Sequence, residues 1–272
     1  MNSRSRKPSI GVFDSGFGGL TVLKELVALN PDADYLYFGD TARLPYGSKS
    51  VETVARYAVE ATRFLEHQGA NLLVIACNTA TALALDRITA ATSLPVMGVV
   101  EPGAEQASAS SKQRKVVVIG TEATVSSHAY LKALRTRGIE AHEKACPLFV
   151  PLVEEGWVDH AVTEQVAEIY LKEAFADGFH DADVLVLGCT HYPLLQPLLR
   201  RVAPPHVTIV DSAHSTANVV AQQIGSSLRS QSAVARTGLR FFATDSVEKF
   251  RKLGPRFLGH PVDQVEHVDL KE

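Results

Sequence analysis

Two hydrophobic runs of this chain each end in a cysteine that is followed by polar residues. Residues 72–76 lead into Cys77, and residues 184–188 lead into Cys189. A short apolar run of this kind is typical of a buried strand in a parallel sheet. The chain has only 3 cysteines in 272 residues, so two of them at equivalent strand ends indicate a repeated unit. We therefore expect two buried strands that each present a thiol at the carboxyl end.

Strand and helix signals alternate along the whole chain. Strands are predicted at residues 9–13, 35–38, 72–76, 115–119, 184–188 and 239–244. Helices are predicted between them, at residues 20–29, 51–68, 125–137, 160–176 and 247–253. For the helix at 160–176, the predicted apolar face consists of Val162, Val166, Ile169 and Tyr170. This alternation predicts an α/β fold with mainly parallel sheets that are covered by helices.

The two halves of the chain follow a similar plan. From the turn at Asp14 to Cys77 the interval is 63 residues, and from the turn at Gly120 to Cys189 it is 69 residues. We predict two similar α/β domains related by a pseudo-two-fold axis, a first domain of residues 1–98 plus 211–272 and a second of 99–210. Because ligands of open α/β sheets bind outside the carboxyl ends of the strands, the active site is expected in the cleft between the domains.

The composition excludes several classes of protein. Apolar residues make up 46% and charged residues 21%, with a net charge of −3, so no nucleic-acid partner is expected. Arg4, Arg6 and Lys7 are interpreted as a solvated tail, and no secretory signal follows them. No membrane span is predicted, because Asn78 and Thr79 interrupt the longest apolar run. Three distant cysteines fit a reducing compartment, so the predicted location is cytoplasmic.

A glycine-rich turn follows the first predicted strand. It carries Asp14 and Ser15, and its glycines permit a close backbone approach at the start of a helix, where an anion is stabilised. The spacing of a dinucleotide-binding fingerprint is absent. The alternative is a capped turn in which Asp14 only accepts hydrogen bonds from backbone amides. A second loop, with Tyr46 and Gly47 after a proline, is either a ligand-binding loop or ordinary turn chemistry.

The cysteines are the main candidates for chemistry. Free cysteine is commonly a buried structural residue, yet polar residues that a closed core would disfavour follow Cys77 and Cys189. A thiolate is the reactive form, and His191 is placed to tune Cys189. Asn78, Thr79 and Thr190 are candidate donors to a ligand carboxylate. Cys146 has no such polar neighbours and is interpreted as a structural thiol.

Cofactor chemistry has little support in the sequence. The cysteines with Asp14 and His191 include zinc-ligand types, but no Cys-x-x-Cys pair occurs and the spacing does not fit a structural zinc site. No lysine adjoins these motifs to hold pyridoxal phosphate. We therefore expect neither a metal nor a cofactor.

Taken together, these motifs resemble the glutamate racemases of the cofactor-independent aspartate/glutamate racemase superfamily. The resemblance spans nearly the whole chain. Each motif alone is weak evidence for the family, but the complete set in this order is specific for it. In chain order the motifs are Asp14-Ser15-Gly16 with Gly18-Gly19, Gly39-Asp40, Pro45-Tyr46-Gly47, Cys77-Asn78-Thr79, Gly120-Thr121 with Thr124, Ser127 and Tyr130, Glu154-Glu155-Gly156, and Cys189-Thr190-His191-Tyr192-Pro193.

The resemblance implies interconversion of L- and D-glutamate by two-base proton transfer, without cofactor or metal. Cys77 would act on D-glutamate with the help of Asp14, and Cys189 on L-glutamate with the help of His191 and Glu154. The resemblance also implies D-glutamate supply for peptidoglycan synthesis, and a homodimer. The implied substrate-binding residues are Asp14, Ser15, Tyr46, Gly47, Asn78, Thr79, Thr121, Thr190 and His191.

Three other functions remain open at this stage. The first is a racemase of aspartate or a related acid in the same superfamily. The second is a non-catalytic binding protein for acidic amino acids, in which the thiols are inert. The third, a thiol redox protein, is disfavoured because Cys77 and Cys189 lie on separate units with no resolving partner near in sequence.

Overall fold

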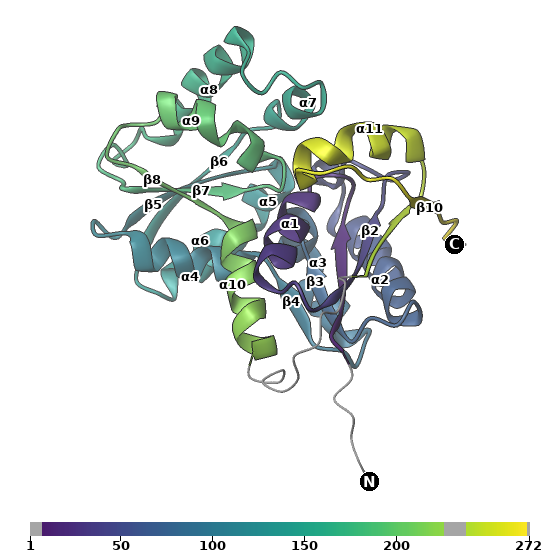
Figure 1. Cartoon of the computed structure of the whole chain (residues 1–272). Coiled ribbons are helices and arrows are strands. Elements are labelled where there is room, and N and C mark those ends of the chain that lie inside the picture. The colour runs from purple at the N-terminus through teal and green to yellow at the C-terminus, as the bar shows by residue number, and fades with distance from the viewer. Residues whose placement is uncertain (1–6, 226–237, 271–272) are drawn as a thin grey trace.

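The computed structural model describes residues 7–225 and 238–270 and contains two parallel sheets (Figure 1). All neighbouring strands of the larger sheet run parallel. Its order is β10 (Val265–His267), β9 (Leu239–Ala243), β2 (Asp34–Gly39), β1 (Ser9–Asp14), β3 (Leu72–Ile75) and β4 (Val96–Gly98). The last part of the chain thus extends the first sheet beyond β2.

The smaller sheet repeats the arrangement of the first four strands. Its parallel order is β6 (Glu140–Ala145), β5 (Lys115–Gly120), β7 (Val184–Gly188) and β8 (Thr208–Asp211). In both sheets the first strand of the unit is central, with the second on one side and the third and fourth on the other. The third strands, β3 and β7, are those that precede Cys77 and Cys189. The predicted pair of similar, pseudo-two-fold related α/β units is confirmed.

Helices cover both faces of the sheets. In the first unit, α1 (Leu20–Leu29) and α11 (Val247–Leu258) pack together, as do α2 (Val51–His67) and α3 (Asn78–Ala90). The side chains of β1 alternate accordingly: Val12 lies in the core with α1 and α11, and Phe13 lies in the core with α2 and α3. Helix α10 (Ser212–Gly225) packs against α1 and against α4 (Val100–Ser110), and so joins the two units.

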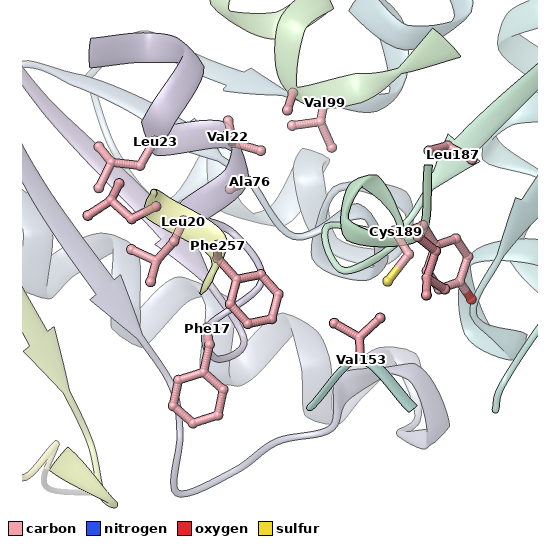
Figure 2. Close-up of a cluster of buried hydrophobic side chains, with 14 of the residues drawn as sticks. Phe17, Leu20, Val22, Leu23, Ala76, Val99, Val153, Leu187, Cys189 and Phe257 are labelled. Atoms are coloured by element: carbon pink, nitrogen blue, oxygen red, sulfur yellow. The ribbon is translucent and has the colours of Figure 1, made fainter. Parts of the chain in front are cut away.

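Several of the remaining helices belong to the second unit, and all of them except α8 are short. These are α5 (Glu122–Ser127), α6 (Ala129–Arg135), α7 (Phe149–Glu154), α8 (Ala161–Ala174) and α9 (Gln196–Val202), with the 3-10 turns η1 (Tyr46–Ser48) in the first unit and η2 (Tyr192–Leu195) in the second. One hydrophobic core cluster continues from the first unit into the second. Figure 2 shows part of it, with Phe17, Leu20 and Phe257 on one side and Leu187 and Cys189 on the other.

One sequence prediction about the helices is wrong, and another is wrong in part. The single helix expected at 125–137 is two helices, because His128 adopts a left-handed conformation (φ 55°) between α5 and α6. On α8, Val166 and Tyr170 of the predicted apolar face are partly buried against the core, but Val162 and Ile169 are 41% and 57% exposed, and the fully buried face is centred on other residues. That face carries Ala167 and Ala174, whose small side chains let the helix approach the sheet closely.

The sequence also left several elements unassigned. Helix α3 begins at Asn78, so the polar residues after Cys77 form its first turn rather than a loop. Strands β4, β6, β8 and β10 were not expected; β4 and β10 have three residues each, and β6 is rich in charged residues. The predicted domain boundaries remain a prediction.

The ends of the chain bear on two further expectations. Lys7, assigned to a solvated tail, instead forms an ion pair with Asp34 at 2.6 Å. Arg4 and Arg6 lie outside the described residues. Within residues 7–225 and 238–270, no helix combines the length and the apolar character needed to cross a bilayer.

Candidate active site

Both strand-end cysteines line one cavity of about 320 Å³ between the two units. The first unit contributes Ser15, Gly16, Leu44, Pro45, Tyr46, Gly47, Ser48, Cys77, Asn78 and Thr79. The second contributes Thr121, Glu122, Pro147, Val150, Pro151, Glu154, Cys189, Thr190 and His191. The structure therefore brings together every predicted site residue except Asp14, which lies behind the cavity wall.

Cys77 stands at the junction of β3 and α3. It is the N-cap of α3, and its Sγ accepts a hydrogen bond from the backbone N–H of Ala80 at 3.4 Å. The thiol donates to Oγ of Ser15 at 3.6 Å. Burial, together with the charge of Asp14, raises the pKa of Cys77 to about 12, although the bonds to Ala80 and Ser15 oppose this shift. Cys77 is therefore protonated at neutral pH.

Cys189 stands in the equivalent place after β7 but has different neighbours. The parallel register pairs Gly120 with Gly188, so the two strands end level with each other, and the residues that follow them, Thr121 and Cys189, both line the cavity. Sγ of Cys189 lies 4.0 Å from Nδ1 of His191. The second ring nitrogen of His191, Nε2, lies 3.3 Å from Oε1 of Glu154. Cys189 thus begins a chain of polar contacts that Cys77 lacks.

The charged groups in this series of contacts, from Cys189 through His191 to Glu154, stabilise one another. Burial disfavours the imidazolium form of His191, but the hydrogen bonds to Cys189 and Glu154 outweigh it and raise the pKa of His191 to about 10. Burial likewise disfavours the carboxylate of Glu154, but hydrogen bonds to His191 and Lys249 lower its pKa to about 2. At neutral pH the arrangement is an imidazolium between a carboxylate and a sulfur atom. Such a cation stabilises negative charge on Cys189.

Asp14 lies at the end of β1 and is completely buried. Its Oδ2 accepts a hydrogen bond from the backbone of Gly16 at 2.9 Å, and its Oδ1 accepts one from the Thr190 hydroxyl at 3.5 Å. Burial raises the pKa of Asp14, while the charge of His191 opposes this shift. The contact with Gly16 is that of a capped turn, and the contact with Thr190 crosses to the second unit. Asp14 therefore has both a local and an inter-unit partner.

Hydroxyl and amide groups of both units line the cavity between the thiols. Oγ1 of Thr79 lies 2.9 Å from Oγ1 of Thr121. The Thr124 hydroxyl lies 3.2 Å from that of Thr79 and 2.9 Å from that of Thr121. These three hydroxyls therefore connect α3 to α5. The Oδ1 of Asn78 accepts a hydrogen bond from Tyr130 at 2.7 Å. These hydroxyl and amide groups are uncharged, and they can form hydrogen bonds with a small polar ligand.

The loop that carries Tyr46 and Gly47 closes one side of the cavity. Tyr46 lines the cavity, but its hydroxyl donates to the buried carboxylate of Asp40 at 2.5 Å. The hydrogen bond of the Tyr46 phenol to Asp40 thus fixes the position of the loop. A Cβ atom on Gly47 would lie only 2.9 Å from Cβ of Thr121, so the loop can approach the second unit this closely because residue 47 is glycine.

Cys146 lies apart from this site. It is fully buried, its thiol donates to the backbone carbonyl of Lys144 at 3.7 Å, and it does not line the cavity. This placement agrees with a structural thiol.

Sequence reasoning missed two kinds of site residue. Lys249, nearly 60 residues after His191 in the chain, donates to Oε2 of Glu154 at 2.9 Å, and no motif marked it. Other cavity-lining residues were also missed: the apolar wall formed by Pro147, Val150 and Pro151, and the separate positions Leu44, Ser48 and Glu122. Two prolines within five residues close to Cys146 were a signal for an irregular segment, but not for its position beside the cavity.

The sequence model of Asp/Glu/Hydantoin racemase matches residues 10–220, a stretch that includes both cavity cysteines. The chain belongs to the Asp/Glu/Hydantoin racemase family. The predicted family is thus confirmed, as is the prediction that the chain is an isomerase of the racemase class.

Individual relatives are similar over nearly their full length. The chain is 62% identical to the glutamate racemase of Koribacter versatilis (strain Ellin345), with 97% of this chain and 98% of the relative covered. It is 47% identical to that of Geobacter metallireducens (strain ATCC 53774 / DSM 7210 / GS-15), with 97% of each covered. Among solved structures, glutamate racemase from Francisella tularensis subsp. tularensis SCHU S4 in complex with D-glutamate has a TM-score of 0.89 at 35% identity, with 98% of each chain covered.

Proposed function

We propose that this chain interconverts L- and D-glutamate by proton transfer between two cysteines. The observation that carries the proposal is that Cys77 and Cys189 line one cavity from equivalent strand ends of two similar units. Inverting a carbon atom through a planar carbanion requires a base on one face and an acid on the other. Thiols from two units related by a pseudo-two-fold axis supply this pair when the α-carbon lies between them, at roughly 3 to 4 Å from each.

The two thiols have different roles because their neighbours differ. We assign the deprotonation of L-glutamate to Cys189, whose thiolate form is supported by the imidazolium of His191 and, through it, by Glu154. Its sulfur takes the α-proton, the electron pair passes to the α-carbon, and the thiol of Cys77 gives its proton to the opposite face. In the reverse direction Cys77 takes the proton with the help of Asp14, and Cys189 gives one. Each turnover leaves the two thiols with exchanged protonation states, and no redox partner is needed.

The polar lining suits an acidic amino acid. Hydroxyl and amide groups of Ser15, Asn78, Thr79, Thr121 and Thr190 are assigned to the carboxylates and the amino group of the substrate, together with the loop at Tyr46 and Gly47. Cys77 and Thr121 are N-caps of α3 and α5, so two helix amino termini open onto the cavity. The partial positive charge at a helix amino terminus favours anions. The glutamate racemase complex with D-glutamate supports glutamate as the substrate.

The deciding experiment follows deuterium and optical rotation together. The purified, metal-free protein is incubated with L-glutamate in heavy water. Loss of rotation with gain of α-deuterium is expected. Binding of L-glutamate without exchange would contradict catalysis and favour an acidic amino-acid binding protein. L-Aspartate is run in parallel, and faster exchange of aspartate would move the assignment to an aspartate racemase.

We also propose a cellular role. D-Glutamate is a building block of bacterial peptidoglycan, so the product would supply cell-wall synthesis in the cytoplasm. We expect a homodimer that needs no metal, cofactor or nucleic acid. Expression in a bacterium that depends on added D-glutamate tests the role: growth without D-glutamate is expected for the wild-type chain and not for a Cys77→Ser variant.

A further inference from the structure

Helix α11 of the first unit contacts the Cys189 side of the cavity. Nζ of Lys249 donates to Oε2 of Glu154 at 2.9 Å. The ring of Phe257 meets the ring of His191 edge to face, with centroids 5.2 Å apart and planes at 81°. A segment that folds onto the first sheet thus packs against two groups beside the second cysteine.

The carboxylate of Glu154 is shared between the two units. Its Oε1 faces Nε2 of His191 at 3.3 Å, and its Oε2 faces the ammonium of Lys249 at 2.9 Å. With one oxygen assigned to each cation, the carboxylate has little freedom to rotate. The Lys249 ammonium is itself placed over the ring of Phe17, 5.4 Å from its centroid.

We propose that Lys249 is a positioning residue for the Cys189 half of the reaction. By holding Glu154, Lys249 keeps the His191 ring oriented and positively charged beside the sulfur of Cys189. This inference rests on the proposed two-cysteine racemisation and adds a residue from α11 to it. Lys249 does not line the cavity, so it acts through Glu154 rather than on the substrate.

An ordinary surface ion pair is the competing explanation. The Lys249 side chain is 47% exposed, and pairs between exposed side chains contribute little. Glu154, however, is only 16% exposed, and it also contacts a His191 side chain that is nearly buried. Removing the cation therefore disturbs a partly desolvated carboxylate, and the disturbance reaches Cys189 within two contacts.

Other titratable groups near Cys189 and His191 come from several elements. Asp14 is close enough to interact electrostatically with His191, and Cys77, Cys146, Tyr130 and Tyr192 are each close enough to interact electrostatically with Cys189. None of these groups changes in a Lys249 variant. If a Lys249 variant changes the reactivity of Cys189 but not that of Cys77, the change is therefore transmitted through the contact of Lys249 with Glu154.

The test measures thiol reactivity in the full-length protein. Methyl methanethiosulfonate, a small thiolate-specific reagent, is used at neutral pH, and the labelled Cys77 and Cys189 peptides are quantified by mass spectrometry. In Lys249→Gln we expect the Cys189 rate to fall about tenfold, with less than about a twofold change at Cys77. Lys249→Arg should restore most of the rate. Lys252→Gln, which removes an exposed cation of the same helix, is the matched control and should react like the wild type.

Racemisation kinetics give a second readout. Lys249→Gln should lower kcat about tenfold with less than about a twofold change in KM. A rise in KM alone would instead mean that Lys249 attracts the anionic substrate, and it would overturn the proposal. Unchanged Cys189 labelling, equal effects in Lys252→Gln, or a Cys189 that does not react in the wild type would overturn it as well. If the wild type labels as expected but does not racemise glutamate, the proposed function fails while the positioning contact stands.

Discussion

Gly18 and His191 come from different units and lie in direct contact. A Cβ atom on Gly18 would stand 2.5 Å from Nδ1 of His191 and 2.3 Å from the hydroxyl of Thr190. Nδ1 is also the atom that faces Cys189. The position of the imidazole therefore depends on the absence of a side chain in the glycine-rich turn, 173 positions earlier in the chain.

Replacing Gly18 by alanine should displace His191 from Cys189. The added methyl group cannot fit without movement of the ring, which Phe257 confines on another side. We expect Gly18→Ala to lower kcat/KM at least about tenfold and to destabilise the fold by about 1–3 kcal/mol. Racemisation assays with thermal unfolding measure both quantities. Wild-type kcat/KM in a folded Gly18→Ala variant would show that this contact does not matter.

The three cysteines should respond differently to serine. Cys77→Ser and Cys189→Ser should each lower turnover by at least about a hundredfold while the protein stays folded, because a serine hydroxyl is a far weaker acid than a thiol and so provides almost no anionic base at neutral pH. Cys146→Ser is the matched control, since it changes the same atom in a buried position away from the cavity, and it should retain activity. Loss of activity in Cys146→Ser alone would refute the assignment of the site.

The raised pKa of His191 predicts a stability loss at alkaline pH. The folded-state value of about 10 lies above the ordinary value of 6.5, so the native state holds a proton that the unfolded state releases. The associated stability is fully present below pH 6.5 and is lost as the pH rises through 10. Between these values the wild type should lose up to about 1.4 kcal/mol per pH unit more than His191→Gln. Denaturant titrations at several pH values measure the slopes, and parallel slopes would contradict the prediction.

Tyr130 supports a predicted substrate-binding residue from the opposite unit. Its hydroxyl donates to Oδ1 of Asn78, and both groups are buried. Tyr130→Phe should leave that oxygen without this donor, destabilise the fold by about 1–3 kcal/mol and raise KM for glutamate. Tyr170→Phe is the control, because the Tyr170 hydroxyl accepts a bond from the exposed Leu148 and lies outside the cavity lining. Equal KM in the two variants would count against a role for Asn78 in binding.

Much of the fold was predictable from local pattern. The runs before Cys77 and Cys189 are strands because they are continuously apolar and bounded by turn residues, which is how buried parallel strands appear in sequence. Strand β6 was not predictable in this way, because Glu140 and Lys144 give it the polarity of a loop. The buried face of α8 was predicted only in part: Val166 and Tyr170 pack against the core, but Val162 and Ile169, which share their helical spacing, are exposed.

The sequence by itself determined the alternation of strands and helices, the repeat and the two strand-end cysteines, because these depend on neighbouring residues. Only the tertiary structure decided that the thiols share one cavity and which contacts hold the groups around each of them. Lys249 reaches Glu154, and Gly18 makes room for His191, through contacts between residues far apart in the chain. Such contacts are set by how the two units pack against each other, and no local periodicity records them.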